Sequence, residues 1–378
     1  MKSAVTVIIP AYNAGRELRL CLSALREGDE QPEELFVADD GSTDSTAQVA
    51  REFGATVWPT EGRVGPARAR NLAARQATGS LLIFFDADVV PHPQTLGRLR
   101  AALESDPALD AVIGAYDDAP DCGQFLSQYR NLQHCFVHRS GRRAAFSFWT
   151  GCGAVRREKF IAQGGFLESY GKPSIEDVEF GARLIRAGGS IALDPGIQVK
   201  HLKRWTFRDM VRTDIFQRAV PWTELIVREG QLPNDLNLAT SQRISAGLAL
   251  LGLFAAAVGI WFAGPRLLAA LMSAMGIALA AFWIESPKRI ATGALWLAAT
   301  GGIWWQGHRL EQSAILPAIA IVAFTGAGLA LNHGFFRFLA QRRGLAFAAA
   351  AAPFFLLYLV YSSLTFALVS LRLRLMNR

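Results

Sequence analysis

Residues 81–89 read LLIFFDADV, an apolar run that ends in two carboxylates, Asp86 and Asp88. The run has the length and bulk of a buried parallel strand. In open α/β sheets, ligands bind at the carboxyl ends of the strands, which is where these acids stand. Mg²⁺ and Mn²⁺ prefer carboxylate oxygens and keep positions open for phosphate oxygens. We therefore predict a metal and diphosphate site here, although a lone Asp-x-Asp also occurs in solvated turns.

Strand and helix patterns alternate along the chain before this run. Apolar, β-branched runs predict strands and helical spacing predicts helices at residues 5–9, 16–25, 34–38, around 57 and 65–75. This alternation predicts an α/β fold with a doubly wound, Rossmann-like sheet that binds a nucleotide. The chain has no GxGxxG fingerprint, which disfavours an NAD-dependent enzyme.

Composition divides the 378 residues into a soluble and a membrane part. Hydrophobic residues make up 51% of the chain, and most charged residues precede about residue 243. The four cysteines lack CxxC or zinc spacing, and the first apolar run is too short for a signal peptide, so we expect the N-terminal part to stay in the cytoplasm. The net charge of +7 favours anionic lipid headgroups or a phosphorylated substrate over nucleic acid.

Four short motifs then occur in a specific order. They are PAYN at 10–13, DDGSTD at 39–44, ARN at 69–71 and DAD at 86–88. In this order and spacing they resemble the family 2 glycosyltransferases of the GT-A fold, which transfer a sugar from a nucleotide-sugar donor with inversion. The resemblance covers about the first 225 residues and implies a GT-A domain over 1–225.

The resemblance also implies a donor site. Pro10, Tyr12 and one or both of Asp39 and Asp40 would hold the base and ribose of the nucleotide, and Arg70 would lie near the donor pocket. A carboxylate can accept the imide N–H of uracil, so we expect a UDP-sugar. For Tyr12 and Arg70, ordinary packing and surface charge are the alternatives.

The segment HLKRW, which begins at His201, matches the QxxRW pattern of the family except that His replaces Gln. QxxRW is associated with processive polysaccharide synthases, so the replacement disfavours that activity. In other GT-A enzymes a His here contacts the metal, and the resemblance therefore implies Asp86, Asp88 and His201 as ligands of Mg²⁺ or Mn²⁺. Asp86 would also meet the ribose, Arg204 would neutralise the diphosphate, and Trp205 would line the acceptor side of the site. A basic patch beside the membrane is the alternative.

The pair Glu176-Asp177 opens a predicted helix. In the family, the second acid of such a pair is the general base, so the resemblance implies that Asp177 is the base and Glu176 is its neighbour or an acceptor contact. Inversion requires a base because the acceptor hydroxyl must lose its proton during the attack. Without the resemblance, Asp177 could be only a partner of the helix dipole.

Residues 124–143 predict an amphipathic helix that carries His134 and His138 four positions apart. Such a pair can bind zinc, but no HExxH pattern accompanies it, which favours surface or acceptor-side histidines. The helix could also lie along a bilayer.

The last part of the chain predicts membrane helices. We expect interfacial helices over 206–238 and an interfacial linker over 226–243. We also expect a transmembrane domain of four or five spans over 244–378, with a basic interface helix at 332–344. The candidate spans are 244–263, 267–284, 290–305, 313–331 and 345–371. Five spans would place the C-terminal arginines outside, against the positive-inside rule, so the number of spans stays open.

These features predict an inverting, metal-dependent glycosyltransferase at the inner membrane, with its catalytic domain in the cytoplasm and a lipid or lipid-linked acceptor. The spans carry almost no ionisable residues, which disfavours a polar sugar channel. The alternatives are a processive polysaccharide synthase coupled to export and a catalytically inactive membrane scaffold.

Overall fold

The computed structural model describes residues 2–230, 240–263 and 312–376. The chain divides into two compact units, Met1–Leu236 and Asn237–Arg378, and each is described by itself.

The first unit is built on an eight-stranded sheet with the order β3-β2-β1-β4-β7-β6-β8-β5. In chain order the strands are β1 (Val5–Ala11), β2 (Glu34–Asp39), β3 (Thr56–Pro59), β4 (Leu81–Phe85), β5 (Val89–Pro91), β6 (Ala111–Tyr116), β7 (Cys152–Arg156) and β8 (Ile191–His201). The first four are mutually parallel, as the alternating pattern predicted. The rest of the sheet is mixed, because β7 is antiparallel to β4 and β6, and β5 is antiparallel to β8.

The apolar run at 81–89 is not one strand. It breaks after Phe85, and Val89–Pro91 starts a new strand at the far edge of the sheet, where Val89 pairs with His201. The turn between β4 and β5 therefore carries Asp86 and Asp88 from the centre of the sheet to its edge.

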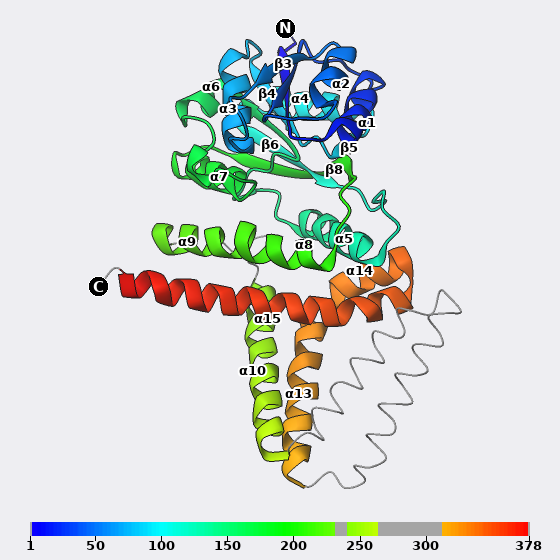
Figure 1. Ribbon diagram of the computed structural model, residues 1–378, viewed down its shortest axis with the longest axis vertical. Helices are drawn as coiled ribbons and strands as arrows, with labels where there is room; N and C mark the ends of the chain where they lie inside the picture. Colours follow the sequence, from blue (N-terminus) through cyan, green and yellow to red (C-terminus); the bar gives the residue numbers. More distant parts are fainter. Residues whose placement is uncertain (1, 231–239, 264–311, 377–378) are drawn as a thin grey trace. The chain divides into compact units, whose positions relative to one another are not determined.

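Helices flank the sheet (Figure 1). They are α1 (Gly15–Arg26), α2 (Thr46–Glu52), α3 (Pro66–Gln76), α4 (Thr95–Ser105), α5 (Phe125–Ser140), α6 (Arg157–Ala162), the 3₁₀ turn η1 (Glu168–Tyr170) and α7 (Glu176–Arg186). Between α3, α7 and the sheet, the buried ring of Phe84 packs edge-on against Phe148 and Phe166, with centroids 6.1 and 5.2 Å away. This aromatic core fixes where α3 and α7 meet the carboxyl end of β4.

The predicted interfacial segment is helical where it is described. It comprises α8 (Phe207–Arg212), the π-helical stretch η2 (Thr213–Ala219) and α9 (Val220–Glu229). Asp214 of η2 is buried and paired with Arg130, so this segment packs against α5 within the first unit.

The second unit consists, where described, of α10 (Thr240–Ala263), α13 (Gln312–Leu331), α14 (His333–Arg343) and α15 (Leu345–Met376). Among the described residues, Thr240–Val258 and Leu345–Met376 are long and apolar enough to cross a membrane, and a third span is possible if α13 and α14, bent by 71°, count as one. The expected spans at 267–284 and 290–305 lie outside the described residues.

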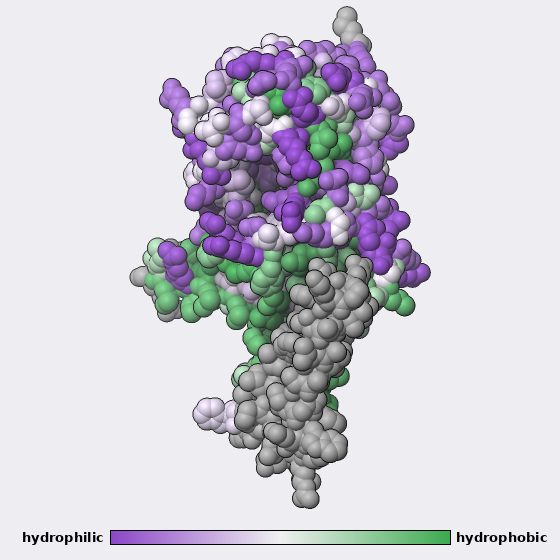
Figure 2. All heavy atoms as spheres, turned by 45° about the vertical axis from the view of Figure 1, so that its right-hand side comes forward, coloured by the Kyte–Doolittle hydropathy of each residue, from purple (hydrophilic) through white to green (hydrophobic). Residues whose placement is uncertain are grey.

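Large apolar side chains of these helices are exposed in the second unit, and hydrophobic surface is prominent in Figure 2. Examples are Phe254 (68% exposed), Trp261 (84%), Val322 (71%) and Leu368 (67%). Apolar exposure on this scale is typical of helices that meet lipid.

We expect Gly181→Ala to destabilise the protein by about 1–3 kcal/mol, the usual cost of overpacking. Gly181 lies in α7, and an added Cβ would stand 2.6 Å from the carbonyl carbon of Ser147, which is backbone and cannot move alone. The matched control is Gly97→Ala in α4, where the nearest atom belongs to the flexible side chain of Glu30 at 3.2 Å. There, helix propensity favours Ala by up to about 1 kcal/mol. Equal unfolding midpoints for the two variants of the purified full chain would contradict the close packing of α7.

Candidate active site

Arg70 joins two of the acidic segments that the sequence singled out. It lies in α3 with only 4% of its side chain exposed. One terminal nitrogen is 2.6 Å from Oδ1 of Asp86, and the other is 2.9 Å from Oε1 of Glu176. A buried guanidinium requires such partners because an unpaired buried charge is costly. The turn after β4 and the start of α7 therefore converge on one cation, although 90 residues separate Asp86 from Glu176 in the chain.

Asp177 stands in the first turn of α7, next to this pair. Its Oδ2 accepts hydrogen bonds from the backbone N–H and the hydroxyl of Thr150, at 3.2 and 3.3 Å. Burial, and then the adjacent charge of Glu176, raise the pKa of Asp177 to about 7, and Arg70 offsets this only in part. A carboxylate with a pKa near neutrality is suited to accept a proton at physiological pH.

Asp88 lies beside His201 because β5 and β8 are neighbours. Nε2 of His201 is 3.5 Å from Oδ2 of Asp88, and the backbone N–H of Leu202 donates to the Asp88 carbonyl at 2.9 Å. Burial would raise the pKa of Asp88, but His201 and Lys203 outweigh burial and lower it to about 2. Asp88 is therefore ionised at neutral pH.

The predicted nucleotide-binding acids follow β2 and have different surroundings. Both oxygens of Asp40 accept from the backbone N–H of Gly65, at 3.0 and 3.2 Å, so this side chain anchors the loop before α3. Asp39 accepts at Oδ1 from the backbone N–H of Ser42, at 3.1 Å. Of the two acids, Asp39 is better placed to accept from a nucleotide base.

Pro10 and Tyr12 lie at the carboxyl end of β1, next to these acids. Ala11 is in register with Asp39, and the backbone N–H of Asp40 donates to the Ala11 carbonyl at 2.8 Å. The ring of Tyr12 is 38% exposed, with the guanidinium of Arg63 4.1 Å from its centroid. Arg63 therefore covers one face of a half-exposed ring at the carboxyl end of a parallel strand, where ligands bind in open α/β sheets.

The residues after His201 have different surroundings from one another. Trp205 is 2% exposed and its indole N–H donates to Asn131 at 3.1 Å, so it packs inside the unit. Arg204 is exposed and donates to Gln124 at 2.9 Å. Lys203, which the motif did not single out, holds its ammonium 4.4 Å from the Trp205 ring centroid and interacts electrostatically with Asp88. The alternation of side chains in an extended segment could have indicated that Lys203 follows His201 on the same side.

The sequence and structure also match known proteins. Residues 6–163 match the model of Glycosyl transferase family 2. This α/β domain belongs to glycosyl transferase family 2. The matched stretch includes the acids of β2, Arg70 and the Asp-Ala-Asp turn.

Two curated relatives of this glycosyltransferase domain illustrate the range of the similarity. The chain is 35% identical over 140 residues to glycosyltransferase AglE of Haloferax volcanii, which covers 34% of this chain and 46% of AglE, about half of that protein's length. It is 25% identical over 236 residues to the O-antigen chain rhamnosyltransferase RfbN of Salmonella typhimurium, covering 58% and 74% of the two chains.

A solved structure shows the same fold. The mannosyltransferase PcManGT from Pyrobaculum calidifontis, solved in complex with GDP-Man and Mn²⁺, aligns with a TM-score of 0.53 and 22% identity over 93% of this chain and 88% of that one. The predicted fold class, a GT-A glycosyltransferase domain followed by helices apolar enough to span a membrane, is confirmed.

The acidic residues of the domain fit a divalent cation that takes some ligands from the protein and the others from a substrate. Within the described ranges, no group of three or more His, Cys, Asp or Glu side chains is arranged to hold a metal ion. Asp88 and His201 form a pair, whereas Oδ1 of Asp86 is occupied by Arg70. Mg²⁺ and Mn²⁺ commonly use one or two protein ligands and take the remainder from phosphates and water, and imidazole suits Mn²⁺. A pair of protein ligands is therefore sufficient for a metal–diphosphate site.

His134 and His138 are half-buried residues of α5 rather than open surface ligands. Nε2 of His134 is 2.8 Å from a terminal nitrogen of Arg218, and both imidazoles stack near Tyr116. Burial and then Arg218 lower the pKa of His138 to about 4 and that of His134 well below its usual range. Both are therefore neutral at pH 7. In the part of the chain that the structure describes, no Asp, Glu or Cys completes a zinc site with them.

We expect Asp177→Asn to raise the unfolding temperature at pH 8 and to leave it unchanged near pH 4. The pKa of Asp177 is higher in the folded than in the unfolded protein, so ionising it destabilises the fold as the pH rises from about 4 to about 7. Asn has the same shape and no charge, and avoids that cost. Thermal unfolding of the full chain across this pH range measures the effect.

Asp44→Asn is the matched control with the opposite sign. Burial would raise the pKa of Asp44, but hydrogen bonds from Thr46 and Gly15 outweigh burial and lower it. This carboxylate therefore stabilises the fold at pH 8, and its contribution disappears as the pH falls below the depressed pKa. If the effect of both substitutions on the unfolding temperature changed with pH in the same direction, the pKa of Asp177 would not be raised by folding.

Proposed function

We propose that the protein is an inverting, metal-dependent glycosyltransferase that moves a sugar from a nucleotide-sugar to a lipid or lipid-linked acceptor at the cytoplasmic face of the inner membrane, in which it is anchored by several spans. The convergence of the Asp86–Asp88 turn with Asp177, through the shared partner Arg70, carries this proposal. It supports the proposal because a carboxylate whose pKa is near neutrality and the Asp86–Asp88 turn lie around one cation.

The donor binds across the carboxyl ends of β1, β2 and β4. Asp39 accepts from the base, Tyr12 stacks against it, and Asp86, oriented by Arg70, contacts the ribose. A carboxylate at Asp39 accepts from the imide N–H of uracil, so a UDP-sugar is the first donor to test. GDP-sugars are the second, because PcManGT was solved with GDP-Man.

Asp88 and His201 would hold the divalent cation, which, when bound, supplies positive charge to the diphosphate. Lys203 adds a further cation beside Asp88. Lys203 would stabilise the negative charge that develops on the leaving diphosphate, and with the charge of a cation held by Asp88 and His201 no acid catalyst for the leaving group would be needed.

Asp177 takes the proton from the acceptor hydroxyl. As the acceptor oxygen bonds to the anomeric carbon, the bond from that carbon to the diphosphate oxygen breaks, and attack from the opposite face inverts the configuration. Thr150 holds Oδ2 of Asp177 in place during this step. Glu176, which is engaged by Arg70, orients the pair and keeps the pKa of Asp177 high.

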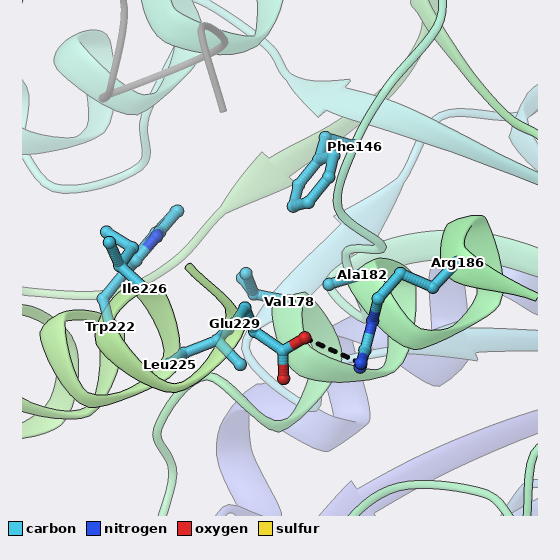
Figure 3. Close-up of a pocket in the computed structure, with 8 residues that line it drawn as sticks. All are labelled: Phe146, Val178, Ala182, Arg186, Trp222, Leu225, Ile226 and Glu229. Carbon is cyan, nitrogen blue, oxygen red and sulfur yellow. Dashed lines mark ion pairs between the residues drawn. The ribbon is translucent and has the colours of Figure 1, made fainter. Parts of the chain in front are cut away.

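An apolar pocket between α7 and α9 supports an acceptor with an apolar part (Figure 3). Its enclosed cavity is about 20 Å³, room for about one water molecule, and the space around it is open to solvent. Its lining residues are Phe146, Val178, Ala182, Arg186, Trp222, Leu225, Ile226 and Glu229. Side chains from α7 and α9 face one another across it, and the Arg186–Glu229 ion pair, at 2.7 Å, lies at one side. Val178 follows the proposed base directly in the chain, so the pocket adjoins the helix turn that carries the base.

We expect Asp177→Asn to lower sugar transfer by about 100-fold to 10,000-fold, the usual contribution of a general base. Binding of UDP with Mn²⁺ should persist, because Asp177 contacts neither. Asp88→Asn should instead weaken the Mn²⁺-dependent stabilisation of the protein by UDP, measured by thermal shift. The assay uses radiolabelled UDP-sugars and GDP-sugars with membrane lipid extract as acceptor.

The same assay separates the other two functions. A ladder of long chains would show a processive synthase instead of single transfer. An absence of transfer and hydrolysis with every donor, together with no effect of Asp177→Asn, would show an inactive scaffold.

We expect Ile226→Trp to raise the KM for a lipid-linked acceptor at least tenfold, because the indole fills the apolar pocket. Hydrolysis of the donor without acceptor should be unchanged. Glu224→Trp, two positions away on the exposed side of α9, is the matched control and should behave like the wild type. An unchanged KM for Ile226→Trp would show that the acceptor does not bind in this pocket.

A further inference from the structure

Asn131 of α5 connects the proposed metal ligand His201 to Trp205. Its side chain is almost fully buried, at 1% exposure. Oδ1 is 2.7 Å from Nδ1 of His201 and 3.1 Å from Nε1 of Trp205, while Nδ2 donates to the backbone carbonyl of Lys203 at 3.2 Å. None of these three contacts is with a family motif acid, and no pattern in the sequence singled out Asn131.

These contacts determine which way the Asn131 amide is oriented. The indole N–H of Trp205 can only donate, and the carbonyl of Lys203 can only accept. The amide oxygen must therefore face Trp205, and the amide nitrogen must face Lys203. The reverse orientation would place two donors together at Trp205 and two acceptors together at Lys203.

The orientation of the amide in turn fixes the tautomer of His201. Because Asn131 presents an acceptor, Nδ1 of His201 must carry the proton. In the neutral imidazole, Nε2 then has the lone pair, and Nε2 is the atom 3.5 Å from the Asp88 carboxylate. The ring of Tyr116 stacks on the imidazole with a centroid separation of 4.3 Å and an interplanar angle of 13°, which holds the plane of the ring.

We propose that Asn131, with its amide locked by Trp205, is a positioning residue that presents the Nε2 lone pair of His201 toward Asp88 for a divalent cation. This inference rests on the proposed function. It assigns Trp205 a role through Asn131 instead of direct contact with the substrate. Residues that hold the second nitrogen of a metal-binding His typically change metal affinity by 10–100-fold.

The test measures Mn²⁺ affinity of the purified full chain with UDP, by the electron paramagnetic resonance signal of free Mn²⁺. We expect Asn131→Leu to weaken Mn²⁺ binding by about 10–100-fold. Asn131→Asp retains the acceptor for Nδ1 of His201 but loses the donor to the Lys203 carbonyl, so it should lose less Mn²⁺ affinity than Asn131→Leu. Trp205→Phe keeps the ring but removes the donor that fixes the amide, and should give an intermediate loss. Equal affinities for the wild type and Asn131→Leu would overturn the inference.

Nitrogen NMR of ¹⁵N-His-labelled protein without metal gives a second readout that does not depend on folding of a variant. The His201 signals, assigned by their loss in His201→Ala, should show a proton on Nδ1, the nitrogen that faces Asn131. An unprotonated Nδ1 in the wild type would overturn the inference directly.

His201→Ala distinguishes this inference from the proposed function. If His201→Ala leaves Mn²⁺ affinity unchanged, the metal site itself is wrong and the positioning role fails with it. If His201→Ala weakens binding but Asn131→Leu does not, only the positioning role is wrong.

Discussion

The ion pairs of Arg70 are the interaction on which the geometry of the site depends. A guanidinium with 4% exposure is stable only while its partners remain in place, and those partners come from the turn after β4 and the first turn of α7. Arg70 thereby holds three segments of the chain together: α3, the Asp-Ala-Asp turn and the start of α7. Removing either carboxylate would leave a buried charge incompletely compensated, so the site and the local fold cannot vary independently.

The same cluster gives its carboxylates different properties through their neighbours. Asp88, close to His201 and Lys203, has a lowered pKa, whereas Asp177, buried beside Glu176, has a raised one. One acid is therefore a permanent anion, suited to a cation, and the other can exchange a proton near pH 7. Two carboxylates whose pKa values are pushed apart are typical of sites that separate binding from proton transfer. Here the separation follows from the charged neighbours of each acid, His201 and Lys203 for Asp88 and Glu176 for Asp177.

Sequence patterns predicted the elements whose signals are local. Strand burial and turn formation depend on neighbouring residues. Local patterns therefore predicted the apolar runs of β1, β2 and β4 and the acids at the ends of β2 and β4. The break of 81–89 into two strands was not predictable, because β5 is defined by its pairing with β8, about 110 residues later. For the same reason, no local pattern indicated that Asn131 binds His201. The burial of Trp205 was not predictable either, because a motif records residue type but not burial.

The family match ends in the chain between the residues proposed to hold the donor and those proposed to act on the acceptor. The matched residues, 6–163, contain Asp39, Arg70 and Asp88, which in the proposed reaction hold the donor, but they end before Asp177 and His201. The proposed base and the apolar pocket come from α7 and α9, which lie beyond the match. Arg70 spans this division, because it binds Asp86 on one side and Glu176 on the other. A change in the acceptor part can therefore alter which hydroxyl reaches the anomeric carbon while the donor part is kept, provided that the contact between Arg70 and Glu176 still places Asp177 beside the diphosphate site.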